Sequence, residues 1–513
     1  MKNVTRKTNI KRNLTFNIIK YVVQLLLQFV LRTALIYIMG AEYLGLNGLF
    51  TNIFGFLSLA ELGIGSAIVF SMYKPIADGD IEKVKALQNL YKKFYLIISG
   101  IVIVVGLAIL PFLKFFIDGE VGVDINIYVL YILYLMNTLL GYLSAHKRSL
   151  LFAYQRNDVE NKVKTACLLG MTVLQIVVLC IFKNYYIFFI VNVVFTAIES
   201  IAIHFYAKKL YPDIAGKAAP LDKQTNNEIK KNVIALSMHR VGWVIVCSTD
   251  NILISAMLGL TVLGAYSNYY LIVSSLMAIF TLLTGALTGS VGNLIASSDK
   301  EYVESKFKKI NFLFSIFSAF CTVCMLCLFQ PFIQSWTGGG IYMLNFSCVV
   351  LMCLSFYINR MRTATNIFKD GAGIFYQNRI SPIVEALVNL VASILLGIYL
   401  GLNGIILGTI ISTIAAPLWV EPKVLYKHYF KKSVGGYFKT YLRDVVIMVV
   451  TAVACYGVGL LLPIGGLWWL ALRFVVCIAL CVIMLCILYA PTKEFKELFT
   501  GVIEKLRNKK AGK

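Results

Sequence analysis

Residues 14–39, LTFNIIKYVVQLLLQFVLRTALIYIM, form an apolar segment long enough to span a bilayer as a helix. At about 100° per residue, its polar side chains share roughly one third of the helix circumference; they are Asn17, Lys20, Tyr21, Gln24, Gln28 and Arg32. A Lys or Arg near the bilayer centre costs about 2.5–3.5 kcal/mol, so such residues usually face a bundle interior or a watery cavity. The segment therefore predicts a helix that lines a polar, cationic lumen, with the other helices arranged around it.

The two cations of this helix have a second interpretation. Lys20 and Arg32 each lie about two turns from an end of the segment, so their charged groups could instead reach the two membrane–water interfaces. That interpretation leaves Gln24 and Gln28 unexplained, because both lie between the cations on the same face. We therefore predict that all four side chains line the cavity.

The composition identifies a membrane protein. Of the 513 residues, 59% are hydrophobic and 14% are charged, whereas soluble domains contain about 45–50% apolar and about 25% charged residues. Nearly all of the 12 cysteines lie in apolar segments, and Cys321, Cys324 and Cys327 have no His or carboxylate beside them. We expect these thiols to be small helix residues, and we predict neither a metal site nor a disulfide scaffold.

Fourteen segments of about 20 residues or more could span the membrane. They cover residues 14–39, 46–72, 94–116, 127–146, 164–182, 185–206, 233–258, 262–292, 310–331, 344–366, 381–400, 403–422, 443–462 and 468–490. This pattern predicts an all-α integral membrane protein with 14 transmembrane helices.

The basic residues predict the topology. Most of the 48 Lys and Arg residues lie in alternate connections, at residues 1–13, 74–93, 147–164, 208–231, 300–309, 360–379, 423–443 and 493–513. Because cytoplasmic loops carry the Lys and Arg excess, both termini are predicted to be cytoplasmic. The net charge of +23 then reflects membrane topology and does not indicate nucleic-acid binding.

An internal repeat relates the two halves of the chain. GAEYLGLNGLF from Gly40 aligns without gaps with GLTVLGAYSNY from Gly259, and the same offset aligns IADGDIEKV from Ile76 with IASSDKEYV from Ile295. The repeat predicts two parallel six-helix bundles with the substrate site between them. The predicted organisation is a first bundle at 1–206, a cytoplasmic linker at 207–232, a second bundle at 233–425, two additional helices at 426–490 and a basic cytoplasmic tail at 491–513.

The repeat pairs the first span with the seventh, residues 233–258. That segment also carries an embedded polar face, formed by His239, Arg240, Trp243, Asp250 and Asn251. Both leading helices are therefore predicted to be walls of one central cavity. Two alternatives stay open here: His239 and Arg240 could reach the cytoplasmic interface, and Asp250 could pair with a neighbouring cation for structure alone.

Several stretches together resemble one family of transporters. They are AELGIGSAI at 60–68, IADGDIEKV at 76–84, TDNILIS at 249–255 and YSNYYLIV at 266–273. They resemble the Wzx-type flippases, the polysaccharide transporter branch of the multidrug/oligosaccharidyl-lipid/polysaccharide exporter superfamily, and the resemblance covers nearly the whole chain. It implies twelve core helices in two bundles plus two extra helices, and a carrier rather than an enzyme.

The resemblance also implies a substrate and a location. A Wzx-type protein moves an undecaprenyl-diphosphate-linked repeat unit from the cytoplasmic to the outer leaflet of the cell membrane by alternating access. Capsule and lipopolysaccharide are among the polymers that such units build, and glycosyltransferases and a polysaccharide polymerase are the implied partners. Cavity residues vary greatly in this family, so the resemblance assigns no exact binding site.

A diphosphate-linked oligosaccharide suits the predicted lumen. Arg binds phosphate through forked hydrogen bonds and Lys acts as a point charge, while amides and aromatic rings suit sugars. We predict diphosphate contacts from Lys20, Arg32, Arg240, Arg360 and Arg362. Topology explains Arg360 and Arg362 equally well. The other predicted cavity residues are Tyr21, Gln24, Gln28, His239, Trp243 and Asn251.

Transport requires a downhill substrate or an ion gradient. A proton or Na⁺ could bind one of the carboxylates in or near the spans, which are Asp250, Glu61, Glu199 and Glu385. Glu385 could instead cap a helix or pair with a cation. The sequence has no Walker lysine motif, so we expect neither ATP hydrolysis nor a cofactor.

Two other functions compete with this interpretation. A multidrug antiporter of the same superfamily would favour a carboxylate-rich lumen for organic cations, whereas the first helix carries Lys, Gln and Arg. A membrane glycosyltransferase or polymerase needs an acid/base or metal constellation, usually on a sizeable outer loop. The outer connections near 117–126 and 333–343 are short and lack such a cluster.

Overall fold

The computed structural model describes residues 6–58, 64–117, 125–214, 216, 221, 223–374, 376–463 and 466–497. At residues 6–11, 13, 14, 64, 66, 67, 223–247, 286, 289, 296, 376 and 467 it describes the backbone without the side chain. Every regular element within the described ranges is a helix, which agrees with the predicted all-α class.

The chain divides after Gly264 into two compact units. The first unit contains α1 (Arg6–Ile38), α2 (Ala41–Leu57), α3 (Ile64–Asp78), α4 (Ile81–Ile109), α5 (Ile127–Leu143), α6 (Ala145–Ala153), α7 (Asn157–Phe182), α8 (Tyr185–Leu210) and most of α9 (Lys223–Ser297). The second unit contains the rest of α9, α10 (Lys300–Thr337), α11 (Phe346–Met361), α12 (Thr363–Gly371), α13 (Ser381–Leu400), α14 (Leu402–Ala415), α15 (Pro417–Leu425), α16 (Gly435–Leu460) and α17 (Leu467–Tyr489).

Short helical turns join some of these helices. They are the 3₁₀ turns η2 (Leu110–Phe116), η3 (Pro212–Ile214), η4 (Gly340–Tyr342) and η5 (Tyr376–Asn378), and the π-helical turn η6 (Tyr426–Phe430). The two units are defined by the contacts within each of them, whereas the predicted bundles at 1–206 and 233–425 are defined by the sequence repeat. The predicted domain boundaries therefore stay a prediction.

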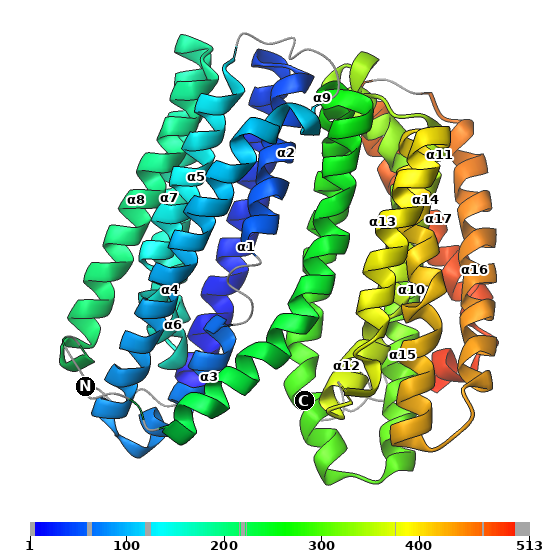
Figure 1. Cartoon of the computed structure of the whole chain (residues 1–513). Coiled ribbons are helices and arrows are strands. Elements are labelled where there is room, and N and C mark those ends of the chain that lie inside the picture. Colours follow the sequence, from blue (N-terminus) through cyan, green and yellow to red (C-terminus); the bar gives the residue numbers. More distant parts are fainter. Residues whose placement is uncertain are drawn as a thin grey trace, which may run out of the picture. The chain divides into compact units, whose positions relative to one another are not determined.

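Aromatic residues form much of the core of the first unit. In this unit α7 packs against α1 and α8, and α8 packs against α5 (Figure 1). Phe50 and Phe54 lie one turn apart on α2 and reach Tyr131 and Tyr134 of α5, with ring centroids 5.0–6.1 Å apart. Phe189 of α8 stacks on Tyr134 at 3.9 Å between centroids. These rings join three helices that lie far apart in the sequence.

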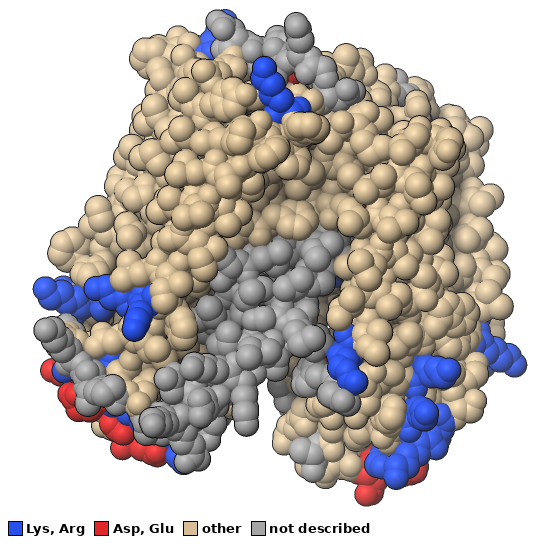
Figure 2. All heavy atoms as spheres, in the orientation of Figure 1, with Lys and Arg blue, Asp and Glu red and all other residues tan. Residues whose placement is uncertain are grey.

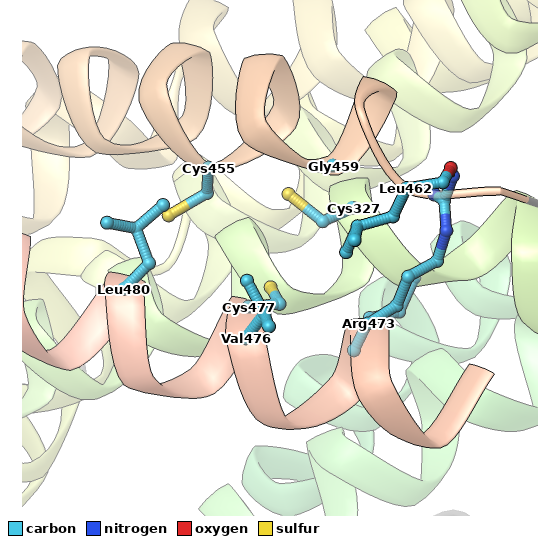
Figure 3. A pocket seen from close by; sticks show the side chains of 9 residues that line it. Cys327, Cys455, Gly459, Leu462, Arg473, Val476, Cys477 and Leu480 are labelled. Carbon is cyan, nitrogen blue, oxygen red and sulfur yellow. The ribbon is translucent and has the colours of Figure 1, made fainter. Parts of the chain in front are cut away.

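Cysteines contribute to the core of the second unit, where α10 packs against α11, α16 and α17. Cys324 and Cys327 of α10 lie within hydrogen-bonding reach of Cys477 of α17, and Cys324 also reaches Cys481. Cys327 of α10, Cys455 of α16 and Cys477 of α17 line a void of about 10 Å³, and Figure 3 shows their side chains. All five cysteines belong to or pack against one apolar cluster, so they act as the small helix residues that the sequence predicts.

The number of membrane spans differs from the prediction at two places. Twelve segments of the described chain are long and apolar enough to cross a membrane. Predicted span 46–72 is covered by α2 and α3, which flank residues that the structure does not describe. Helix α9 runs through the predicted spans 233–258 and 262–292 and is interrupted at Gly259, where φ is 83° and ψ is 171°. The count of fourteen and the topology therefore stay predictions.

Helices α4 and α10 begin well before their predicted apolar spans. α4 starts at Ile81 and α10 starts at Lys300, about three turns before the apolar residues that hydropathy detects. The Asp80 carboxylate accepts a hydrogen bond from the backbone N–H of Lys83 at 2.9 Å and so caps α4. The polar first turns of both helices continue a membrane helix, which a hydropathy pattern does not register.

The internal repeat is visible in the backbone. Gly40 directly precedes α2 with φ of 94°, and its counterpart Gly259 interrupts α9 with φ of 83°, a conformation that favours glycine. Asp80 and its counterpart Asp299 both occupy the cap position before a long helix. The two copies thus place their turns at equivalent residues.

Two further equivalent glycines allow a close crossing within the first unit. A Cβ atom on Gly45 of α2 would lie 2.1 Å from the carbonyl oxygen of Leu260, and a Cβ on Gly264 would lie 2.1 Å from the carbonyl oxygen of Ala41. Gly45 and Gly264 are matched by the repeat, as are Ala41 and Leu260. The start of α2 therefore crosses α9 through equivalent residues of the two copies.

Candidate functional site

Helix α1 separates its polar and apolar side chains as the sequence periodicity predicts. Val22, Leu26 and Val30 share one face and are 49%, 58% and 50% exposed. Lys20 and Gln24 are half-buried on the opposite face. The exposed apolar face suits contact with lipid, which leaves the polar face for the protein and a substrate.

Lys20 lies among charges of both signs in the first unit. Its ammonium group interacts electrostatically with Glu160 and Lys164 of α7 and with Glu199 of α8. The Glu199 carboxylate also pairs with Arg148 of α6, with 3.0 Å between Nη2 and Oε1. Glu199, a predicted ion-coupling residue, is therefore part of a charge network near the middle of α1.

Arg32, in the C-terminal part of α1, lies beside a group of polar aromatic residues. It interacts electrostatically with the buried Tyr185 of α8. The Tyr185 ring lies 5.2 Å from that of Tyr43 on α2, and its hydroxyl lies next to Asn47 and Tyr134. A guanidinium group, an amide and phenol rings provide contacts suited to phosphate and sugar. The sequence pattern did not predict Tyr43, Asn47 and Tyr185, because only the packing of α1, α2 and α8 places them near Arg32.

The predicted residues of the seventh span are described in part. Asn251 is buried and Asp250 is half-buried on α9. The side chains of His239, Arg240 and Trp243 lie outside the described part of the chain. Glu61 lies outside it as well. The common cavity for α1 and this segment stays a prediction.

A buried charge cluster lies in the second unit. The guanidinium of Arg362 donates to both oxygens of Glu421, with Nε–Oε2 at 2.8 Å and Nη2–Oε1 at 2.9 Å. Its Nη1 also donates to Glu385 Oε1 at 3.2 Å. Lys369 lies 3.4 Å from Glu421 Oε1, and Arg362, Lys369 and Glu421 are each less than 10% exposed. Two cations and two carboxylates thus compensate each other away from solvent.

This cluster gives a structural role to two of the predicted site residues. The Nε and Nη2 groups of Arg362 already donate to Glu421. Glu385 pairs with Arg362 and accepts a hydrogen bond from the Thr413 hydroxyl at 3.3 Å. The sequence left open the alternative that Glu385 pairs with a cation, and the structure has that pairing. A diphosphate would have to compete with Glu421 for Arg362.

Sequence analysis missed Glu421 and Lys369. A signal was present, because Glu421 is a carboxylate within the predicted span 403–422, and such a residue needs a buried partner. Arg360, close to Arg362 in sequence, is placed differently: its guanidinium carbon lies 5.7 Å from the centroid of the Phe280 ring. Arg360 is half-buried. Two arginines of one segment therefore make different contacts, Arg360 with an aromatic ring and Arg362 with carboxylates.

A polar cavity of about 520 Å³ lies beside the start of α10, between α10, α16 and residues 493–497. Lysines and carboxylates alternate around it. Lys309 pairs with Glu497 at 2.8 Å, and the hydrogen bond from Lys309 lowers the pKa of that carboxyl. Lys432 donates to Glu304, and this hydrogen bond raises the pKa of Lys432. Since carboxylates line it and pair with its lysines, the cavity does not resemble the cationic lumen predicted for the substrate.

The fold is shared with known membrane transporters. The lipid II flippase MurJ in an inward closed conformation matches with a TM-score of 0.66 and 16% identity, over 93% of this chain and 99% of that chain. An inward-facing MATE multidrug resistance transporter of the MOP superfamily matches with a TM-score of 0.60 and 15% identity, over 79% of this chain and 95% of that chain. A variant of the Vibrio cholerae MATE transporter VcmN matches with a TM-score of 0.58 and 14% identity, over 83% and 98%. These likenesses define a multi-pass membrane protein with the MATE and MurJ fold.

The sequence itself identifies the family. The profile of the family described as polysaccharide biosynthesis protein matches residues 10–288, which is more than half of the chain. The chain therefore belongs to the polysaccharide biosynthesis protein family. No curated protein matches it. The family and the shared fold are those that the resemblance to Wzx-type flippases leads us to expect.

Proposed function

We propose that this protein is a flippase for lipid-linked oligosaccharides. It moves an undecaprenyl-diphosphate-linked repeat unit from the cytoplasmic to the outer leaflet of the cell membrane by alternating access. The observation that carries the proposal is the fold shared with a lipid II flippase along nearly the whole chain, in a member of a polysaccharide biosynthesis family. The glycan units then feed capsule, lipopolysaccharide or a related surface polymer through glycosyltransferases and a polymerase.

The polar face of α1 supports an anionic headgroup as the cargo. Lys20 and Arg32 mark the two ends of that face, with Gln24 and Gln28 between them. We assign diphosphate contacts to Lys20, Arg32, Arg240 and Arg360, and sugar contacts to the amides and aromatic rings nearby. The remaining cavity residues in this proposal are Gln24, Gln28, His239, Trp243, Asn251 and Arg362. Arg362 is the weakest candidate of this set, because its guanidinium already donates to both oxygens of Glu421.

Coupling to a proton or Na⁺ is part of the same proposal. Asp250 on α9 is half-buried and belongs to the span that the repeat pairs with α1, so it is our first choice for the coupling carboxylate. Glu199 and Glu385 already pair with arginines, so ion binding there would require an arginine to move. Glu61 is the remaining candidate by sequence.

A cation-coupled multidrug antiporter is the second candidate, because the fold also matches MATE transporters. The charges of α1 argue against it. An organic cation is favoured by carboxylates that balance its charge, whereas the polar face of α1 carries Lys20 and Arg32 and no carboxylate.

Transfer of a fluorescent diphosphate-linked oligosaccharide across proteoliposomes tests the proposal. We expect the native protein to transfer the lipid, and the K20Q/R32Q/R240Q variant to lose at least tenfold in rate because three charge-assisted contacts are removed. The matched control is K93Q/K209Q/K439Q, which removes the same charge from lysines outside the proposed cavity.

Three results separate the function from the site. Loss of transfer in the cavity variant alone, with both variants folded, supports both. Equal transfer by the two variants would support the flippase function but would reject Lys20, Arg32 and Arg240 as the diphosphate site. No transfer by the native protein, with several glycans and with proton and Na⁺ gradients, would favour the multidrug antiporter.

A further inference from the structure

Five basic side chains gather on one surface of the first unit. They are Lys92 of α4, His146 and Lys147 of α6, and His204 and Lys208 of α8. Helix α6 packs against both α4 and α8, which brings three distant parts of the sequence together. Lys147 interacts electrostatically with Lys92 and Lys208, and His146 interacts with His204. We call these five residues the basic patch.

No carboxylate compensates the basic patch among the side chains that the structure describes. The charged groups that act on Lys147 and His204 are all basic. Nearby basic residues are different, since Arg148 pairs with Glu199 at 3.0 Å and Lys85 pairs with Glu82 at 3.3 Å. Like charges held together repel each other, and an anion bound among them would relieve that repulsion.

The surface beside the basic patch is apolar and exposed. Leu96 lies one turn after Lys92 on α4 and is 60% exposed. Ile201 and Phe205 lie two turns and one turn before Lys208 on α8 and are 56% and 65% exposed. Cationic heads next to a lipid-facing apolar surface match a ligand that carries an anionic group at the end of hydrocarbon chains.

The basic patch also lies where the apolar part of the membrane helices ends. In α4 the lysines precede a largely apolar stretch, and in α8 Lys208 and Lys209 lie in the last turn of a mostly apolar helix. The predicted topology places this boundary on the cytoplasmic side. In Figure 2, Lys and Arg side chains lie toward the end of the first unit where α3 and α6 lie, between a broad uncharged surface and the Asp and Glu side chains at the edge.

We propose that the basic patch binds the phosphate headgroup of an anionic phospholipid of the cytoplasmic leaflet. The headgroup lies among Lys92, Lys147 and Lys208, and the acyl chains lie along Leu96 and Phe205. Basic pockets between membrane helices on the cytoplasmic side are suited to such headgroups. The exposed apolar residues favour a lipid over free phosphate, because a small anion gains nothing from them.

The test is lipid binding to the full-length protein in detergent, followed by native mass spectrometry. Dioleoyl phosphatidylglycerol and, as a neutral lipid with the same chains, dioleoyl phosphatidylcholine are titrated into three proteins: native, K92Q/K147Q/K208Q and K93Q/K209Q/K439Q. The last variant removes equal charge, partly from the adjacent lysines of α4 and α8. We expect phosphatidylglycerol affinity to fall about tenfold or more in the patch variant and to change less than about twofold in the control.

Two readouts keep the proposal open to rejection. Thermal unfolding without added lipid should show neither variant to be less stable than the native protein, so that a loss of binding is not a loss of folding. Equal phosphatidylglycerol binding by the patch and control variants would overturn the proposal. Displacement of phosphatidylglycerol by equimolar inorganic phosphate or glycerophosphoglycerol would overturn the lipid assignment and leave a soluble-anion site.

Discussion

Arg362 shows at the scale of a single residue how tertiary contacts change the meaning of a charge. In the sequence it is a basic residue at the end of a predicted span, open to a phosphate or to the membrane interface. In the structure both oxygens of Glu421 and one oxygen of Glu385 accept hydrogen bonds from its guanidinium. A buried charge that loses its partner costs far more than the intact pair contributes. Arg362 is therefore first a structural residue.

Arg362→Met tests this role. The substitution leaves Glu385 and Glu421 without their shared arginine, so we expect the free energy of unfolding to fall by about 3–5 kcal/mol. Thermal unfolding of the purified protein in detergent measures the change. Lys439→Met, at an exposed position, should alter stability by less than about 0.5 kcal/mol. A second variant, Arg362→Met with Glu421→Gln, should recover part of the loss; equal stability of native protein and Arg362→Met would contradict the role.

At the scale of helices, the crossing of α2 and α9 depends on two glycines. Gly45 and Gly264 let each segment approach the backbone of the other, and any side chain there meets a carbonyl oxygen at 2.1 Å. Backbone cannot move aside as easily as the end of a flexible side chain. Gly45 contacts Leu260 and Gly264 contacts Ala41, and the internal repeat matches Gly45 with Gly264 and Ala41 with Leu260.

Gly45→Ala and Gly264→Ala should each destabilise the protein by about 1–3 kcal/mol, since the new methyl group overpacks the crossing. Gly100→Ala is the matched control, because Gly100 is also helical but a methyl group there would have no neighbouring atom within 4 Å. At Gly100 the exchange should raise stability by about 0.5–1 kcal/mol through helix propensity. Denaturation in detergent measures all three variants. The same sign of change at Gly45 and Gly100 would show that the crossing is not closely packed in the membrane.

At the scale of the whole molecule, the open question is how the chain threads through the membrane. Helix α9 contains two predicted spans, and the non-helical Gly259 lies between them. Alternating Lys and Arg content predicts that the residues near Gly259 lie outside and that those near residue 298 lie in the cytoplasm. If α9 crosses twice, its two parts run in opposite directions across the bilayer.

Reporter fusions decide this point. Alkaline phosphatase fused after Gly259 should be active, because it is exported, and phosphatase fused after residue 298 should be inactive. Green fluorescent protein fused to the C-terminus should fluoresce, since the end of the chain is predicted to be cytoplasmic. A fusion after Lys183, in the short connection between α7 and α8, is the positive control for export. Equal phosphatase activity at 259 and 298 would exclude two crossings by α9.

Sequence alone predicted most of the helices, because a membrane span needs about 20 apolar residues and that requirement is local. The class of protein, the cysteines as core residues and the apolar face of α1 followed from composition and periodicity. The first turns of α4 and α10 were not predicted, because a polar turn that continues a membrane helix has no hydropathy signal. The candidate site was predicted only in part: Lys20 and Arg32 stand out by periodicity, whereas Tyr43, Asn47 and Tyr185 do not.

What the sequence by itself determined is therefore the class of fold, the internal repeat and the residues that carry charge into the membrane. Only the tertiary structure decided which of those charges are already paired, as for Arg362 with Glu421, and which are gathered without a carboxylate among the described side chains, as for Lys92, Lys147 and Lys208. The reason is physical. Hydrophobicity and helix period act within one segment, but the energy of a charge depends on partners that packing brings from distant segments.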